Sequence, residues 1–147
     1  GYGITLSARN QQGRRLVLVI NGLGSEAERA SEGERLLAWG FQNFDNKRLF
    51  AANSSVVKAN VWMGEEKEID LVPQADVVLS LPKINQDKVK LSTTYNGPIA
   101  APVVAGQEYG KLTITMPGGE VKEVPLVAAK AVEKLSFFAR IPRILGL

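Results

Sequence analysis

The chain has 147 residues, of which 45% are hydrophobic and 22% charged, and this mixture is typical of a globular protein rather than a disordered one. It contains no histidine and no cysteine, which excludes serine-histidine triads, thiol nucleophiles, disulfides and zinc sites built from those residues. The net charge is +3, and no apolar run approaches the ~20 residues that span a bilayer, so a transmembrane helix is excluded.

The chain is predicted to begin with a β-hairpin. One strand covers Tyr2 to Ala8, a turn covers Arg9 to Gly13, and a second strand covers Arg15 to Ile20. The second strand is an unbroken apolar run, which indicates a strand that is covered on both faces. It is therefore expected to lie inside a larger sheet.

A helix is predicted to follow, from about Glu26 to Phe44. Ser25 and Glu28 have the spacing of a helix N-cap and its capping-box partner. Apolar and small residues recur at steps of three and four, at Ala30, Gly33, Leu37, Phe41 and Phe44. Two strands and one helix have too little apolar surface to fold alone, so residues 1–48 are expected to be the C-terminal piece of a larger domain.

From Asp45 to Asn53 the pattern loses its period, which indicates a domain boundary. Short strands with turn residues between them then predict a small antiparallel all-β sandwich over residues 49–129. The predicted strands are Val56 to Met63, Glu68 to Val72, Val77 to Leu81, Val89 to Tyr95, Lys111 to Met116 and Glu120 to Val127. The fold class is therefore α+β.

Residues 130–147 form a cationic, amphipathic tail. This segment has four basic residues and one acidic residue, so it carries the whole net charge of +3. The sequence predicts a peripheral membrane anchor, with Pro142 limiting any continuous helix. The residues expected to contact the membrane are Phe137, Phe138, Arg140, Ile141, Arg143 and Ile144. The alternative is a C-terminal helix that packs on its own domain.

Several blocks resemble one known family. Glu34-Arg35-Leu36-Leu37-Ala38-Trp39-Gly40-Phe41 is similar to the stretch just after the Lys-Thr-Gly motif of the low-molecular-mass penicillin-binding proteins, which are serine-type D-alanyl-D-alanine carboxypeptidases. Val104-Ala105-Gly106, Gly110-Lys111-Leu112 and Val124-Pro125-Leu126-Val127 resemble the C-terminal β domain of that family. The resemblance implies a remnant of the peptidase domain followed by that β domain.

The resemblance also implies an enzyme that removes the terminal D-Ala from peptidoglycan pentapeptides through a serine acyl-enzyme, with roles in cell wall maturation and cell shape. The family's Ser-x-x-Lys, Ser-x-Asn and Lys-Thr-Gly motifs are absent in usable form. Two Ser-x-x-Lys matches, at Ser55 to Lys58 and at Ser80 to Lys83, are rejected because Val56-Val57 favours a strand and Pro82 would disrupt a helix. No catalytic residue is therefore expected in this chain, which alone is predicted to be inactive.

One substrate residue carries over from the resemblance, namely Arg29. The family places an arginine near the carboxylate of the terminal D-Ala, and counting back from Leu36-Leu37 reaches Arg29. A guanidinium binds a carboxylate with two charge-assisted hydrogen bonds. The alternative is a surface arginine that pairs with Glu26 or Glu32.

The expected partners follow from the resemblance and from the tail. They are the peptidoglycan peptide ending in D-Ala-D-Ala, β-lactam antibiotics, a missing N-terminal catalytic portion, and the periplasmic surface of the cytoplasmic membrane. No cofactor or metal is expected. Nucleic acid is not expected either, because the surplus charge lies in the tail rather than on a folded basic face. The alternative function is a non-catalytic β-rich module for positioning or binding at the membrane or cell wall.

Overall fold

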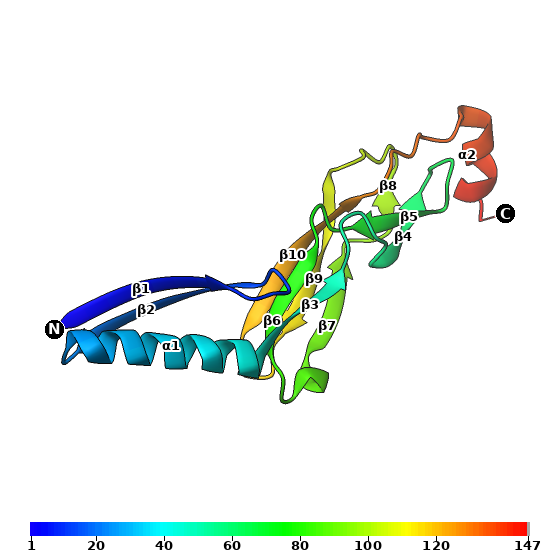
Figure 1. Ribbon diagram of the computed structural model, residues 1–147. Coiled ribbons are helices and arrows are strands. Elements are labelled where there is room, and N and C mark those ends of the chain that lie inside the picture. The colour runs from blue at the N-terminus through cyan, green and yellow to red at the C-terminus, as the bar shows by residue number, and fades with distance from the viewer. Residues whose placement is uncertain (147) are drawn as a thin grey trace. The chain divides into compact units, whose positions relative to one another are not determined.

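The computed structural model describes residues 1–146 (Figure 1). Leu147, which the sequence includes in the predicted tail, lies outside the described residues. The chain divides into two compact units. The first contains Gly1–Lys47 together with Leu79–Gln86, and the second contains the rest of the described chain. Each unit is described by itself below.

The first unit contains the predicted hairpin and helix. Strands β1 (Tyr2–Arg9) and β2 (Arg15–Leu23) pair antiparallel, and α1 (Glu26–Asn43) runs along the hairpin (Figure 1). The predicted cap is confirmed, because the Ser25 hydroxyl accepts a hydrogen bond from the Glu28 amide at 3.2 Å. The Glu28 carboxylate accepts in turn from the Gly24 amide at 2.7 Å, so two otherwise unpaired donors at the helix start are satisfied.

The helix contacts the hairpin through a small residue. Gly33 is buried, and a Cβ atom at this position would lie 2.4 Å from Cδ1 of Leu6. Leu37 and Phe41, on the same predicted stripe, are half-buried, whereas Ala30 is exposed. The stripe that faces the hairpin is therefore shorter than the sequence predicts.

Only one face of β2 is covered within the described residues. Leu16 and Leu18 are half-buried on the helix side, but Val17 and Val19 are 64% and 63% exposed on the other side. Strand β2 also pairs with β1 alone. The expectation that both faces of β2 are covered is thus not met by residues 1–146.

Arg14, between the two hairpin strands, is buried, with its side chain 8% exposed. Its guanidinium lies over the Phe41 ring at 5.7 Å, donates to the Phe44 carbonyl and lies 3.9 Å from the Asp45 carboxylate. Its Nε and Nη2 atoms have no hydrogen-bond partner among the described residues. The sequence did not single out this arginine, because the residues that surround it in the structure, Phe41, Phe44 and Asp45, are far from it along the chain.

Residues predicted to be aperiodic form a strand instead. Strand β3 (Phe44–Phe50) forms a two-stranded sheet with β6 (Val77–Pro82). Residues 45–48 are all exposed, so no apolar alternation marks this strand in the sequence. The sequence analysis therefore placed no strand at these residues.

The second unit is built on a six-stranded sheet with the order β7-β9-β10-β5-β4-β8. These strands are β4 (Val57–Trp62), β5 (Glu68–Val72), β7 (Lys90–Tyr95), β8 (Ile99–Ala100), β9 (Glu108–Thr115) and β10 (Val121–Ala128), with a short 3-10 turn at Gln86–Lys88 before β7. The predicted β-rich character is confirmed. The prediction that all strands are antiparallel is wrong, because β8, which was not predicted, pairs parallel with β4.

The core of this unit is apolar and closed. Its most buried large side chains, each at most 2% exposed, are Ile69, Leu71, Leu112, Ile114 and Leu126. Complete burial of such a side chain stabilises a fold by roughly 1.5–3 kcal/mol before the cost of lost conformational entropy. The strands therefore have an apolar core of their own, which the first unit lacks between Gly1 and Lys47.

Candidate functional site

The C-terminal tail docks on the turn between β4 and β5. The Glu65 amide donates to the Glu133 carbonyl, and the Leu135 amide donates to the Met63 carbonyl, both at 2.9 Å. Gly64 forms a bridge with Lys134, and its carbonyl accepts a hydrogen bond from Nη1 of Arg143 at 2.8 Å. The tail is thus fixed to the β domain through backbone groups before its helix and through the Arg143 side chain within it.

The tail ends in the helix α2 (Phe137–Ile144), which continues through Pro142. The sequence predicted that Pro142 limits any continuous helix in residues 130–147, and in the structure the helix is confined to these eight residues, with Pro142 inside it. Proline costs least in the first turn, where the missing amide has no helical partner, but Pro142 lies near the other end. Because proline has no amide hydrogen, α2 lacks the helical hydrogen bond from residue 142 to the Phe138 carbonyl.

The predicted membrane-contact residues divide by exposure. The apolar residues Phe137, Phe138, Ile141 and Ile144 are exposed, by 82% in the case of Phe138, while Arg140 and Arg143 are half-buried. Leu145 is a further exposed apolar residue at the end of the helix. None of the helices in residues 1–146 is sufficiently long and apolar to cross a membrane. The apolar side of α2 is therefore open, as the anchor interpretation requires.

A hollow of about 350 Å³ lies between this tail and the sheet. Its lining from the sheet is Trp62, Met63, Ala100 and Ala101, and its lining from the tail is Lys134, Arg140 and Ile144. The parallel pairing of β4 with β8 places Trp62 opposite Ala100. Sequence analysis did not find this hollow. The one available signal was Trp62, a large apolar side chain on the exposed side of β4, where its neighbours are Lys58 and Asn60.

Arg29 lies near the start of α1, where its side chain is 33% exposed. Its Nη2 atom lies 3.2 Å from Oε1 of Glu26, one turn back along the helix. Glu32, the other acidic residue considered as its partner, instead binds Arg35, which lowers the pKa of the Glu32 carboxyl. The structure thus places Arg29 at the predicted helix start and in an ion pair.

The two rejected serine-lysine pairs lie on strands or beside them, not on helices. Lys58 lies in β4 and Ser80 in β6. Ser55 donates to Asp70 at 2.8 Å, and Lys58 lies 3.2 Å from the same carboxylate. These contacts hold the pKa of Asp70 below its usual value, first through the Ser55 hydrogen bond and then through Lys58. Asp70 is therefore a weak base, and Ser55 is not an activated nucleophile.

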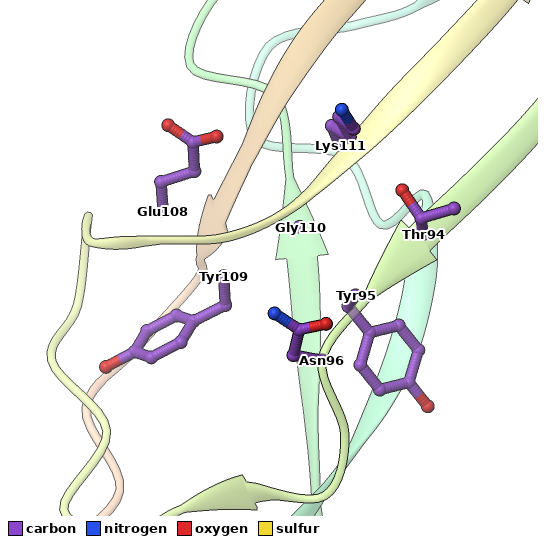
Figure 2. A pocket seen from close by; sticks show the side chains of 7 residues that line it. All are labelled: Thr94, Tyr95, Asn96, Glu108, Tyr109, Gly110 and Lys111. Atoms are coloured by element: carbon purple, nitrogen blue, oxygen red, sulfur yellow. The ribbon is translucent and has the colours of Figure 1, made fainter.

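Figure 2 shows a second hollow, of about 540 Å³, beside the ends of β7 and β9. Tyr95, Asn96 and Tyr109 contribute to its walls, and Glu108 leaves β9 in the opposite direction from Tyr109 (Figure 2). The Tyr109 hydroxyl accepts from the Val104 amide at 3.0 Å, and Lys111 pairs with Glu123 at 3.2 Å. Two of its polar side chains, those of Tyr109 and Lys111, are thus engaged in the fold.

Residues 1–146 bring no three carboxylates together as metal ligands. Their fold and surface define a class of protein: a β-rich domain that carries a docked, cationic tail with an exposed apolar helix.

Comparison with known proteins gives the family. Residues 44–134 match the family described as Penicillin-binding protein 5, C-terminal domain. The chain belongs to this family.

The relatives agree with this assignment. The D-alanyl-D-alanine carboxypeptidases DacC and DacD of Escherichia coli are 30% and 31% identical to the chain over 96% of its length. A crystal structure of penicillin-binding protein 5 from Haemophilus influenzae, 27% identical, superposes with a TM-score of 0.77 over 91% of the chain and 39% of that protein. The chain spans about a third of the length of the curated relatives, 35% and 36% for the two carboxypeptidases.

Proposed function

We propose that this chain forms the C-terminal part of a serine-type D-Ala-D-Ala carboxypeptidase, which removes the terminal D-Ala from peptidoglycan pentapeptides and is acylated by penicillins. The observation that carries the proposal is the alignment of 96% of the chain with proteins named as D-alanyl-D-alanine carboxypeptidases. The alignment extends through the hairpin and α1 as well as the β domain, so both units take part in the resemblance.

In this proposal, residues 1–48 belong to the peptidase domain and residues 49–129 form the β domain that positions it. The exposure of Val17 and Val19 supports the first part, because an apolar sheet face of this kind is stable when another layer covers it. The serine that forms the acyl-enzyme lies outside these 147 residues, since neither Ser-x-x-Lys match here has its serine and lysine on a helix. The chain alone is expected to be inactive.

Labelling with a fluorescent penicillin tests the proposal. The full-length gene product is expected to be labelled covalently at one serine, whereas the 147-residue chain remains unlabelled. A correctly folded full-length protein that takes up no label, and that releases no D-Ala from a pentapeptide, would end the proposal.

Arg29 is proposed to bind the substrate carboxylate. It carries the right group in a half-buried position, and its bond to the exposed Glu26 can be exchanged for one to a substrate. In the full-length enzyme, Arg29→Ala is expected to lower kcat/KM by roughly 10- to 100-fold, as for loss of hydrogen bonds to a charged group. The control is Arg35→Ala, which removes another arginine paired within α1. Equal effects of the two changes would contradict the proposed role.

A second proposed role is peripheral attachment of the tail to the periplasmic face of the cytoplasmic membrane. The exposed Phe137, Phe138 and Ile144 support it, because a few inserted aromatic and aliphatic side chains with nearby cations give modest, reversible binding. The chain is expected to co-sediment with anionic vesicles, more weakly as salt rises. Equal sedimentation after deletion of Lys134 to Leu147 would refute this role.

A further inference from the structure

The charged residues that line the hollow between the tail and the sheet are all positive. Lys134 and Arg140 line it, and none of its lining residues is acidic. Within the described chain, neither of these cations forms an ion pair. Glu65 and Glu66 in the turn and Glu133 beside Lys134 do not line the hollow, and the Glu66 carboxylate lies 2.7 Å from Nζ of Lys130. The lining of the hollow therefore carries two positive charges and no negative one.

One of these cations is held in place. Nε of Arg140 donates to the Leu135 carbonyl at 2.5 Å, which leaves the terminal nitrogens of the guanidinium for another acceptor. Arg143, one turn of helix further on, uses Nη1 to hold the tail on Gly64. A guanidinium with a fixed orientation loses less entropy on binding a phosphate than a free one.

The remaining wall of the hollow is apolar. Trp62 is 49% exposed, and its ring combines an apolar body with one N–H donor. Ile144 lines the hollow and is also part of the exposed apolar side of α2. The hollow thus adjoins the surface that is proposed to enter the lipid.

These features fit an amphiphile with an anionic head. We propose that the hollow binds the phosphate of an anionic phospholipid, with Lys134 and Arg140 as the phosphate ligands and Trp62 and Ile144 along the start of the acyl chains. The proposal rests on the membrane attachment proposed above and gives it a specific headgroup site. A free phosphate would use the cations alone and leave the apolar wall uncovered.

The test separates this site from general attraction to a charged surface. The probe is dihexanoyl phosphatidylglycerol, added to the 147-residue chain below the concentration at which it forms micelles and at constant ionic strength. Binding is followed by ¹H–¹⁵N shifts of the Trp62 indole and of the amides of Ala100, Ala101 and Lys134. Saturable shifts at these groups are expected, and shifts spread over the whole surface without saturation would overturn the site.

Matched variants define the contribution of the two cations. Lys134→Gln and Arg140→Gln are each expected to weaken binding about fivefold. The control is Lys122→Gln, an exposed lysine on β10 that removes one charge from the same unit outside the hollow. It is expected to leave binding within a factor of two. An equal loss in the control would show that net charge, not the hollow, governs binding.

Two further ligands identify the source of the phosphate. Glycerol 3-phosphate and dihexanoyl phosphatidylcholine are both expected to bind at least fivefold more weakly than dihexanoyl phosphatidylglycerol. Equal affinity for glycerol 3-phosphate would make the hollow a plain phosphate site and overturn the lipid assignment. Equal affinity for the choline lipid would overturn the selectivity for an anionic headgroup.

Vesicle binding distinguishes the proposed headgroup site from the proposed peripheral attachment through α2. If the chain binds phosphatidylglycerol vesicles but the soluble lipid does not shift Trp62, the headgroup site is wrong and peripheral attachment stands. If the soluble lipid binds in the hollow but vesicles are not bound, the site stands and attachment through α2 is wrong.

Discussion

The hairpin with its helix and the β domain differ in how completely they bury their apolar side chains. In the β domain, Leu71 and Ile114 are fully buried. Between Gly1 and Lys47 the one fully buried residue is a glycine, Gly33, and the apolar side chains there are half-buried or exposed. The β domain therefore has a core that can support folding, whereas the hairpin and helix gain most of their contacts from each other.

This difference bears on how the two regions depend on other structure. A sheet face with Val17 and Val19 exposed is typical of a sheet that another layer covers. The two tryptophans report on the regions separately, because Trp39 lies in α1 and Trp62 in β4. Replacing one with phenylalanine leaves a fluorescence signal for the other region alone.

The largest expected difference concerns equal truncations in the two regions. Leu112→Ala empties a position that is 1% exposed and is expected to lower the free energy of unfolding of the β domain by about 2–5 kcal/mol. Leu18→Ala removes the same atoms from a half-buried position and is expected to cost less than half as much in the hairpin. Urea unfolding followed by Trp62 and by Trp39 measures the two effects. Equal costs would mean that the first region has a core comparable to that of the second.

Two glycines offer a second contrast. A Cβ atom on Gly110 would lie 2.7 Å from the Thr94 carbonyl oxygen on the paired strand β7, which can move only if the sheet moves. Gly110→Ala is therefore expected to cost about 1–3 kcal/mol. At Gly33 the obstacle is the mobile end of the Leu6 side chain, and helix propensity returns up to about 1 kcal/mol, so Gly33→Ala is expected to cost less.

The control for Gly110 is Gly118→Ala in the turn before β10, where nothing lies within 4 Å of the added atom. Its unfolding free energy is expected to stay within about 0.5 kcal/mol of the parent. If Gly118→Ala were as costly as Gly110→Ala, close packing between strands would not explain the loss.

Elements with a periodic pattern could be predicted from the sequence. The cap at Ser25 placed α1 correctly, and the strands predicted at Lys111 to Met116 and Glu120 to Val127 overlap β9 and β10. Strand β3 could not be predicted, because its middle residues are exposed and show no alternation. Strand β8 has two residues, too few for any period, and is defined by its pairing with β4.

The candidate site likewise has one part that could be predicted from the sequence and one part that could not. The apolar residues of the tail, such as Phe137 and Phe138, stand out in the sequence because they lie close together among basic residues. The hollow could not be predicted, because Trp62, Ala100 and Lys134 are far apart in the sequence. They meet only through the β4-β8 pairing and the docking of the tail on Gly64, which are tertiary contacts.

A smaller effect is expected at the start of α1. Ser25→Ala removes the acceptor for the Glu28 amide and is expected to destabilise the first region by about 1 kcal/mol. Ser31→Ala, inside the same helix, is the control and is expected to be neutral or slightly stabilising because alanine favours helix. Trp39 fluorescence and helical circular dichroism measure both variants. Equal destabilisation by the two changes would show that the cap bond is not the cause.

The smallest effect depends on pH and belongs to the β domain. Because Ser55 and Lys58 lower the pKa of Asp70 in the folded state, the unfolded chain binds a proton at Asp70 more readily as the pH falls. The resulting stabilisation is complete above the ordinary carboxyl pKa and is lost as the pH falls through the lower, folded value. Since the Asp70 side chain is 39% exposed, its size is expected to be about 0.5 kcal/mol or less.

Asp70→Asn is therefore expected to destabilise the β domain slightly at pH 6 and less at pH 2.5, as measured by urea unfolding through Trp62 in a Trp39→Phe background. Lys58→Gln, which removes the second-largest cause, is expected to show the same direction with a smaller amplitude, because the Ser55 hydrogen bond remains. A loss for Asp70→Asn that is the same at both pH values would mean that the side chain acts through its shape and hydrogen bonding, and that its charge adds nothing to the cross-strand pair.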